Sequence, residues 1–441
     1  MTKQDLPRSI GVWGGAAIMV GVMIGSGIFR TPPAIAKEMG SPLLILLVWV
    51  AGGGLCMLGA FTFAELATLY PRSGGLYVFL REGLGDCPAF VFGWTYLLLT
   101  QPLALAALAT VFAEHLLLLL GVKADAWLVS AITCATLLLL TGLNVTGMKR
   151  GAGVAVVLTG FKTLALAAIV AAAVILMKGD AAHFAAVPAP RSFLAALAPV
   201  LVAIFWTYDG WSDVSAVAEE VREPQRLIPR IFLLGTAGIT ALYVAVNAVY
   251  FWLVPLEEMR DTDTIAPLVM QRLLGPAAGV VVTVLIMVSV LGSTHASAIV
   301  GSRVMFAQAR DRLLFSFLGR VHARFQTPSS ALWAQAVLGC AASLGVRQFE
   351  KLIDGFVFTI WVFYGLSALS IFTLRVRRPD LPRPFRCWGY PVVPAVFILA
   401  AAGMLVMSIV ESPRQTLPWL VVLLLGIPAF YLWKRGVRHS A

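Results

Sequence analysis

The sequence is poor in charge. Only 12% of its 441 residues are Asp, Glu, Lys or Arg, whereas 59% are hydrophobic. In an average soluble domain about one quarter of the residues are charged, so this chain has about half the usual share of charged residues. The composition excludes an ordinary soluble protein and predicts an integral membrane protein.

Residues that hold metals and cofactors are scarce as well. The chain has five His and five Cys, and the cysteines lack the spacing of a metal site. It has no GxxxxGK[ST] motif, which argues against an ATP-driven pump, and no dinucleotide or haem motif. The apolar segments hold no nucleophile paired with a base, as an intramembrane enzyme would need. We therefore expect no metal, no cofactor and no catalytic residues.

The chain does contain many long apolar runs. A helix of about 20 apolar residues crosses the roughly 30 Å hydrocarbon core of a bilayer. The runs predict an all-α membrane protein of twelve transmembrane helices in one domain, with a small helical lid in the long loop at 255–275. The predicted spans are 10–36, 42–68, 87–119, 127–147, 152–177, 194–217, 229–254, 276–306, 329–346, 352–374, 391–410 and 418–433.

The 33 Lys and Arg residues outnumber the 22 Asp and Glu residues, and their placement indicates the topology. With a cytoplasmic N-terminus, most of them fall at cytoplasmic ends, in clusters at 222–230, 310–324 and 375–386. The acidic run at 257–263 then lies outside. This pattern satisfies the positive-inside rule and predicts a multi-pass protein of a cell membrane with both termini cytoplasmic. The basic total therefore reflects topology and implies no nucleic-acid partner.

Two predicted spans carry helix-breaking residues in their middles. One break is Gly25–Gly27 in the first span, and the other is Tyr208–Trp211 in the sixth. The broken spans begin two blocks of five helices, 1–177 and 193–376, which a final pair at 391–434 follows. Because five is odd, the two blocks enter the membrane in opposite directions and form a 5+5 inverted repeat. Broken helices in corresponding positions of two repeats are the best sequence indication of a substrate site in a secondary transporter.

The glycines of the first break allow the backbone to leave helical geometry. A short half-helix is expected to begin near Phe29, with Pro32 and Pro33 in its first turn, where proline is tolerated. Its free N–H groups and the positive end of its dipole would accept a carboxylate. The alternative is close helix packing through small residues, as in GxxxG pairs.

Asp209 lies in the middle of the sixth span. An acidic group at this depth is costly and is by default a functional candidate. Its carboxylate either faces a cationic group or an ion, or caps the N-terminus of the second half of the helix. Trp206, Tyr250 and Trp361 are further candidates, as walls of a pocket or as ordinary packing residues.

Lys162 is the only basic residue deep inside a predicted span. We interpret it as a fixed cation that holds unwound carbonyls of the first helix, where another transporter would bind a metal ion. The alternative is a lysine that snorkels to the membrane interface. Ser289 and Ser293 lie four residues apart on one helix face and can donate to the first helix or to Lys162.

Five stretches of the chain, in order, carry a resemblance to a known family. They are Ile24–Phe29; Glu65–Ala67 with Tyr70–Gly75; Tyr208–Trp211 with Glu219 and Glu220; Pro224–Arg230; and Arg383–Arg386 with Gly389–Pro391. On these motifs the chain resembles the L-type amino acid transporters of the amino acid–polyamine–organocation superfamily.

The resemblance implies a LeuT-like fold, with alternating access about a site between helices one and six. It implies that N–H groups near Ser26 and Gly27 hold the substrate carboxylate, and that carbonyls of Met23, Trp206 and Asp209 meet the ammonium group. The predicted substrate site consists of Met23, Ile24, Ser26, Gly27, Trp206, Tyr208, Asp209, Tyr250 and Trp361.

The resemblance also assigns roles to single residues. Trp206 matches an aromatic gate, and Trp361 matches a helix-ten position that closes the side-chain pocket. Lys162 matches a lysine in the sodium position of related sodium-coupled carriers, which implies sodium-independent transport. Tyr250 and Ser289 match positions that neighbour this lysine and the substrate.

One departure from the family concerns a partner. Animal members form a disulfide to a glycoprotein subunit through the outer loop between helices three and four. In this chain that loop, Gly121–Ala126, has no cysteine, so no disulfide-linked ancillary subunit is expected.

The sequence therefore predicts sodium-independent exchange of L-amino acids across the lipid bilayer. Neutral amino acids are favoured, because a zwitterion needs only the two helix breaks. Three alternatives stay open: a carrier of cationic amino acids that uses Asp209, a proton-coupled symporter in which Lys162 titrates, and a sensor that binds amino acids without transporting them.

Overall fold

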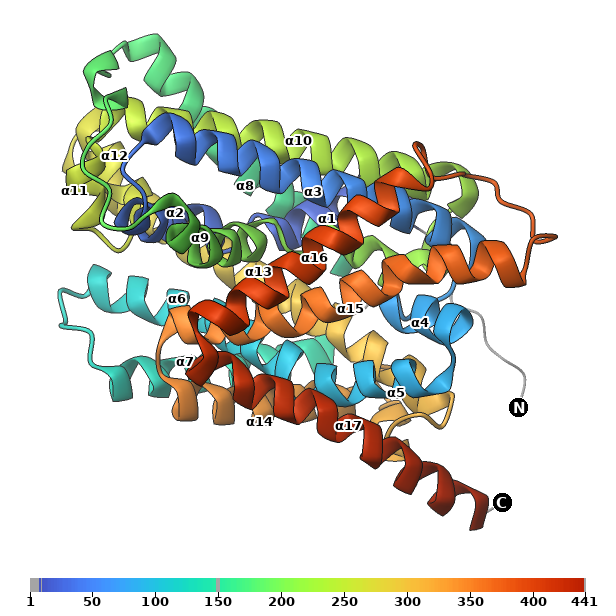
Figure 1. Cartoon of the computed structure of the whole chain (residues 1–441). Coiled ribbons are helices and arrows are strands. Elements are labelled where there is room, and N and C mark those ends of the chain that lie inside the picture. Colours follow the sequence, from blue (N-terminus) through green and yellow to red (C-terminus); the bar gives the residue numbers. More distant parts are fainter. Residues whose placement is uncertain (1–7, 9, 148–150, 440–441) are drawn as a thin grey trace.

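The computed structural model describes residues 8, 10–147 and 151–439 as a bundle of long helices lying side by side (Figure 1). The first helices are α1 (Val12–Met23), α2 (Gly27–Glu38), α3 (Pro42–Leu69), α4 (Leu76–Leu84), α5 (Asp86–Thr95), the π-helical turn η1 (Tyr96–Thr100), α6 (Gln101–Leu119), α7 (Ala126–Gly147), α8 (Gly151–Leu176) and the 3₁₀ helix η3 (Ala181–Phe184).

A second series of helices completes the chain. It consists of α9 (Phe193–Tyr208), the 3₁₀ helix η4 (Asp213–Glu220), α10 (Pro224–Leu253), α11 (Leu256–Arg260), α12 (Ile265–Leu274), α13 (Pro276–Arg310), the 3₁₀ helix η5 (Ser316–Gly319), α14 (Ser329–Val346), α15 (Phe349–Arg377), α16 (Val392–Glu411) and α17 (Pro413–His439).

Twelve helical segments of the described chain are long and apolar enough to cross a membrane, which confirms the predicted number of spans. Helices suit this setting because each satisfies its own backbone hydrogen bonds where no water is available. Local sequence marks their ends. Ser41, for example, accepts a bond from the Leu44 N–H at 3.4 Å, and Pro42 occupies the first helical position of α3.

Both predicted helix breaks are present. The first span divides into α1 and α2, which are separated by Ile24, Gly25 and Ser26. The sixth divides into α9 and η4, which are separated by residues 209–212. The fold class is confirmed, and the division into repeats at 1–177 and 193–376 stays a prediction.

The start of the second half-helix differs from the prediction. Helix α2 begins at Gly27 rather than near Phe29, so Pro32 and Pro33 lie inside it instead of in its first turn. Each of these interior prolines lacks the N–H that would bond to a carbonyl four residues before it.

The third span is not the continuous helix that its apolar sequence predicts. The π-helical turn η1 separates α5 from α6. Such turns inside α-helices are frequent at functional sites. Tyr96 and Gln101, at the two ends of this turn, both line a cavity described below.

Helix packing surrounds the first break. Helix α1 packs against α8, α10 and α13, and α2 packs against α9 and α11. The predicted lid at 255–275 contains the short helices α11 and α12. These lie at the opposite end of the bundle from the marked N and C ends of the chain (Figure 1).

Candidate functional site

The first break leaves a row of backbone donors without partners. The N–H of Ile24 closes the last turn of α1, at 2.8 Å from the Val20 carbonyl. Within the described part of the chain, the N–H groups of Ser26, Gly27 and Ile28 donate to no acceptor. They open α2, where the helix dipole is positive. Three adjacent free donors of this kind form a site for a carboxylate.

At the second break, the chain at the end of α9 lies against the first break. Asp209 is extended, with φ −61° and ψ 148°, and Gly210 has φ +103°, a conformation that favours glycine. A Cβ on Gly210 would lie 2.8 Å from the Val22 side chain. A Cβ on Gly27 would lie 2.6 Å from the Thr207 Cα atom. Glycine is therefore required at both places for the two backbones to meet.

Side chains also join the two broken spans. The Trp206 indole N–H donates to the Ser26 hydroxyl at 3.3 Å, and the hydroxyls of Thr31 and Thr207 lie 2.8 Å apart. All four residues are buried. The two breaks therefore form one local structure.

A small cavity, here called the break cavity, opens beside this junction. Its empty volume is about 340 Å³. Its lining comes from both breaks and from helices α6, α13 and α15: Val22, Met23, Gly25, Ser26, Gly27, Ala104, Leu108, Trp206, Asp209, Ser297 and Phe356.

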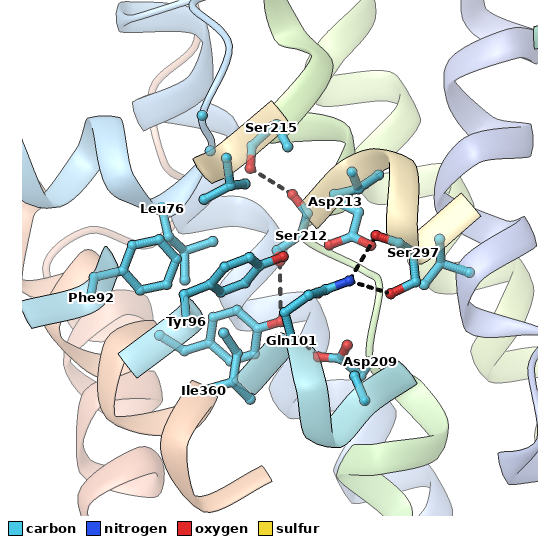
Figure 2. Close-up of a pocket in the computed structure, with 18 of the residues that line it drawn as sticks. Leu76, Phe92, Tyr96, Gln101, Asp209, Ser212, Asp213, Ser215, Ser297 and Ile360 are labelled. Atoms are coloured by element: carbon cyan, nitrogen blue, oxygen red, sulfur yellow. Dashed lines mark hydrogen bonds between the residues drawn. The ribbon is translucent and has the colours of Figure 1, made fainter. Parts of the chain in front are cut away.

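A larger cavity, here called the acidic cavity, adjoins the break cavity. Its empty volume is about 550 Å³, and it shares five lining residues with the break cavity: Val22, Ala104, Asp209, Ser297 and Phe356. Its labelled polar lining, shown in Figure 2, is Gln101, Asp209, Ser212, Asp213, Ser215, Ser297 and Tyr96.

Lys162, on helix α8, supports the first break. Its ammonium group donates to the carbonyls of Gly21 at 3.2 Å and Ile24 at 3.3 Å, and to the Ser293 hydroxyl at 2.7 Å. The Ser289 hydroxyl also donates to the Ile24 carbonyl, at 3.2 Å. Lys162 is only 5% exposed, so the snorkelling interpretation is wrong. Its ammonium group satisfies carbonyls that the end of α1 leaves without helical partners.

Comparison with known proteins agrees with this geometry. The sequence model of the amino acid permeases matches residues 10–430. The chain belongs to the amino acid permease family. This confirms the resemblance to the amino acid–polyamine–organocation superfamily, whose members compared here are amino acid transporters and not enzymes. The chain is a multi-pass membrane protein that transports amino acids.

Several named relatives are similar over nearly their whole length. The chain is 28% identical to the b(0,+)-type amino acid transporter 1 of Mus musculus, over 98% of this chain and 88% of the relative. It is 29% identical to the cystine/glutamate transporter of Homo sapiens, over 98% and 86%. It is 30% identical to the Asc-type amino acid transporter 1 of Mus musculus, over 98% and 82%.

The Met23 carbonyl differs from its predicted role. In this transporter it already accepts from the Tyr243 hydroxyl at 2.6 Å and from the Gly25 N–H at 2.7 Å. A carbonyl oxygen has two lone pairs, so this one has none left for a substrate ammonium group. Met23 still lines the break cavity. Ile24 does not line this cavity, and its carbonyl accepts a hydrogen bond from the Lys162 ammonium group.

Three aromatic residues predicted to touch substrate line neither cavity. Tyr208 packs inward and donates to the Trp49 carbonyl at 3.1 Å. Trp361 stacks on Phe205, with ring centroids 3.8 Å apart. Tyr250 is fully buried, and its hydroxyl has no partner among the described residues. Their contact with substrate stays a prediction, because an aromatic residue in an apolar span looks the same in the sequence whether it packs or binds.

Asp209 lines both cavities, and it is not the residue that caps η4. The residue before η4 is Ser212, whose side chain makes no capping bond. The Asp209 carboxylate instead accepts from the Tyr364 hydroxyl at 2.8 Å, and that hydroxyl accepts from Ser212 at 3.1 Å. The turn at Gly210 carries the chain away before η4 begins.

Four residues of the acidic cavity escaped the sequence analysis: Tyr96, Gln101, Asp213 and Tyr364. Asp213 carries the same indication as Asp209, an acidic residue in an apolar span, but lies just beyond the predicted break. Gln101 donates its amide N–H to the Ser297 carbonyl at 2.9 Å. Its place in the cavity depends on the π-helical turn, which no sequence pattern indicated.

The α2 end of the transporter is closed above the break cavity. The Trp206 ring meets Phe356 edge-on, with centroids 5.2 Å apart. Beyond it, Arg30 pairs with Glu114 at 3.3 Å and with Glu350 at 3.4 Å. These contacts tie α2 to α6 and α15. Towards the other end, the acidic cavity extends to Gly74 and Gly75.

Proposed function

We propose that this transporter exchanges L-amino acids without sodium, by alternating access about the break cavity. The observation that carries the proposal is the row of free N–H groups at Ser26, Gly27 and Ile28 beside a cavity. These donors would bind the substrate carboxylate. Of the three predicted acceptors for the ammonium group, the carbonyls of Trp206 and Asp209 remain available. A zwitterion would therefore bridge the two breaks.

The position of Lys162 supports sodium independence. A sodium ion would need several oxygen ligands, and the carbonyls of Gly21 and Ile24 with the hydroxyls of Ser289 and Ser293 are of that kind. The Lys162 ammonium group already bonds three of these four groups. A fixed positive charge at this place would repel a second cation. No ion is therefore needed to hold the unwound segment between α1 and α2.

Alternating access is supported by the unequal ends of the molecule. The contacts of Trp206, Phe356 and Arg30 close the α2 end, whereas the acidic cavity reaches towards the other end. We propose that substrate binding shifts the population between this state and one open at the α2 end. In this scheme Trp206 is the aromatic gate, since it contacts both Ser26 and Phe356.

The cellular setting is part of the proposal. The basic clusters support a topology in a cell membrane with both termini in the cytoplasm and the α11–α12 segment outside. The loop at Gly121–Ala126 has no cysteine, so we propose that transport needs no disulfide-linked subunit. A neutral amino acid needs only the two helix breaks, because its carboxylate and ammonium groups are the only charges to be bound.

Exchange in proteoliposomes tests this function. Purified protein is reconstituted with unlabelled amino acid inside, and uptake of labelled leucine is measured with sodium or with choline outside. We expect equal uptake in the two media and a strong dependence on internal amino acid. Uptake driven by a proton gradient without internal substrate would replace exchange by proton symport. Binding without any flux would indicate a sensor.

A further inference from the structure

The acidic cavity holds two carboxylates and no basic side chain. Asp209 and Asp213 both line it, and Lys, Arg and His are absent from its lining among the described residues. The carboxylates lie on either side of Gln101 in Figure 2. Both residues are half-buried, and a carboxylate shielded from water is stabilised by a proton, a cation or a set of donors. The side chains that line this cavity therefore supply no positive charge to balance the two carboxylates.

The two carboxylates differ in what they already bind. Asp209 accepts from the Tyr364 hydroxyl at 2.8 Å. The Asp213 carboxylate makes no hydrogen bond or ion pair within the described residues. Gln101, only 3% exposed, directs its amide N–H groups to Ser297, and its amide oxygen has no donor in the same part of the chain. Free acceptors thus collect around Asp213.

The cavity wall suits an organic cation better than a small inorganic one. Its acceptors stand among aromatic rings, those of Phe92, Tyr96, Phe356 and Tyr364. A guanidinium group presents five N–H donors in one plane and stacks on aromatic faces. An ammonium group is attracted to the same faces. The chemistry of this wall therefore matches the end of a cationic side chain.

Asp209 connects this cavity to the zwitterion site. It lines both cavities, so a substrate held at Ser26 and Gly27 can extend its side chain past Asp209. We propose that Asp213, together with Asp209, binds the terminal cation of the substrate side chain, and that the preferred substrates are L-amino acids with a guanidinium or ammonium group. This inference rests on the proposed function. It reverses the preference for neutral amino acids that the sequence suggested.

Arginine and citrulline provide a sharp test, because they have nearly the same shape and differ in charge. In the proteoliposome exchange assay, the wild-type protein should have a much lower KM for arginine than for citrulline. Asp213→Asn should raise the KM for arginine by about tenfold or more, since hydrogen bonds to charged groups contribute about that factor. The KM values for citrulline and leucine should stay within about twofold, because their side chains carry no charge for Asp213 to bind.

Two further variants separate charge recognition from structural damage. Asp213→Glu keeps the charge and should retain the preference for arginine. Asp125→Asn makes the same chemical change in an exposed loop, where Asn can still cap α7, and should leave all KM values unchanged.

The outcomes distinguish this inference from the function on which it rests. If the wild type exchanges leucine but does not prefer arginine to citrulline, the inference is overturned and the proposed function stands. An unchanged arginine KM in Asp213→Asn would also overturn the inference, as would an equal loss for arginine and leucine. If the wild type exchanges none of these amino acids, the proposed function itself fails.

Discussion

At the scale of single residues, Lys162 has the most connected position in the described structure around the first break. Its ammonium group joins two carbonyls of the unwound segment to Ser293 on α13. Without it, the carbonyls of Gly21 and Ile24 would have only serine hydroxyls as donors. A single side chain thus stabilises a backbone conformation that membrane helices otherwise avoid.

Replacement of this lysine should disable exchange. We expect Lys162→Ala to lower the exchange rate by about tenfold or more, because losing a hydrogen bond to a charged group costs about 1.5–3 kcal/mol. Added sodium should restore part of the rate, since the vacated oxygens could then hold an ion. The measurement is leucine exchange with sodium or choline, and Lys351→Ala, an exposed lysine, is the control. Full activity of Lys162→Ala in choline would contradict the fixed-cation role.

Asp209→Asn tests whether this side chain recognises charge. An Asn oxygen can still accept from the Tyr364 hydroxyl, so the local fold should be retained. We expect the KM for arginine to rise by about tenfold, and the KM for leucine to change by less than about twofold. Competition of each amino acid against labelled leucine provides the measurement. An equal loss for both substrates would instead indicate a structural role.

Residue identities explain where sequence analysis succeeded and failed at this scale. Lys162 and Asp209 stood out because a charge in an apolar span has few explanations. Tyr250 was singled out, whereas Tyr243 of the same helix is the tyrosine that reaches the break. Which of them faces α1 depends on how α10 packs, and the apolar pattern of a membrane helix does not indicate its inward face.

At the scale of elements, the breaks could be predicted and the π-helical turn could not. The glycines at Gly25–Gly27 and in the Asp209–Gly210 pair are local causes of unwinding. Both breaks can therefore be predicted from the sequence. The turn at Tyr96–Thr100 directly precedes Gln101 and Pro102, and proline removes a backbone N–H and clashes with the carbonyl four residues before it. Proline indicates a disturbance of the helix here, but not that the helix widens into a π-helical turn. Gln101 was missed for this reason.

The approach of α2 to α9 gives a prediction at this scale. A Cβ at Gly27 would lie 2.5 Å from the Thr207 hydroxyl and 2.6 Å from its Cα, so the two helices must separate. We expect Gly27→Val to abolish measurable substrate binding, because separation removes the paired breaks and the new side chain covers the free N–H groups. Substrate-induced thermal stabilisation of the purified protein is the measurement.

A matched control addresses general damage by valine. At Gly142, in α7, an added Cβ would meet nothing within 4 Å, so Gly142→Val should keep normal binding. Unchanged affinity in Gly27→Val would count heavily against the site. A loss in both variants would show that valine disturbs the bundle wherever it is placed.

At the scale of the whole molecule, the balance between two states should depend on the contacts that close the α2 end. Arg30 pairs with Glu114, Glu350 and Asp263, on three different segments, and lies over the Phe349 ring. Its side chain is 11% exposed, whereas that of Asp263 is 74% exposed. Ion pairs with exposed partners contribute about 0.2–1 kcal/mol each. Together they can shift a two-state equilibrium without disrupting either state.

Loss of Arg30 should therefore open the α2 end more often. In Arg30→Ala, a reporter cysteine introduced by Ala104→Cys in the lining of the break cavity should react about two to ten times faster with a membrane-impermeant thiol reagent applied at the α2 end. The reason is that 1.4 kcal/mol corresponds to a factor of ten in the population of the open state. Arg226→Ala removes an exposed pair with Glu223 before α10, at 3.7 Å, and should leave this rate unchanged. If Arg30→Ala did not accelerate the reaction, the Arg30 contacts would be bystanders, and closure would depend on the apolar layer of Trp206 and Phe356 alone.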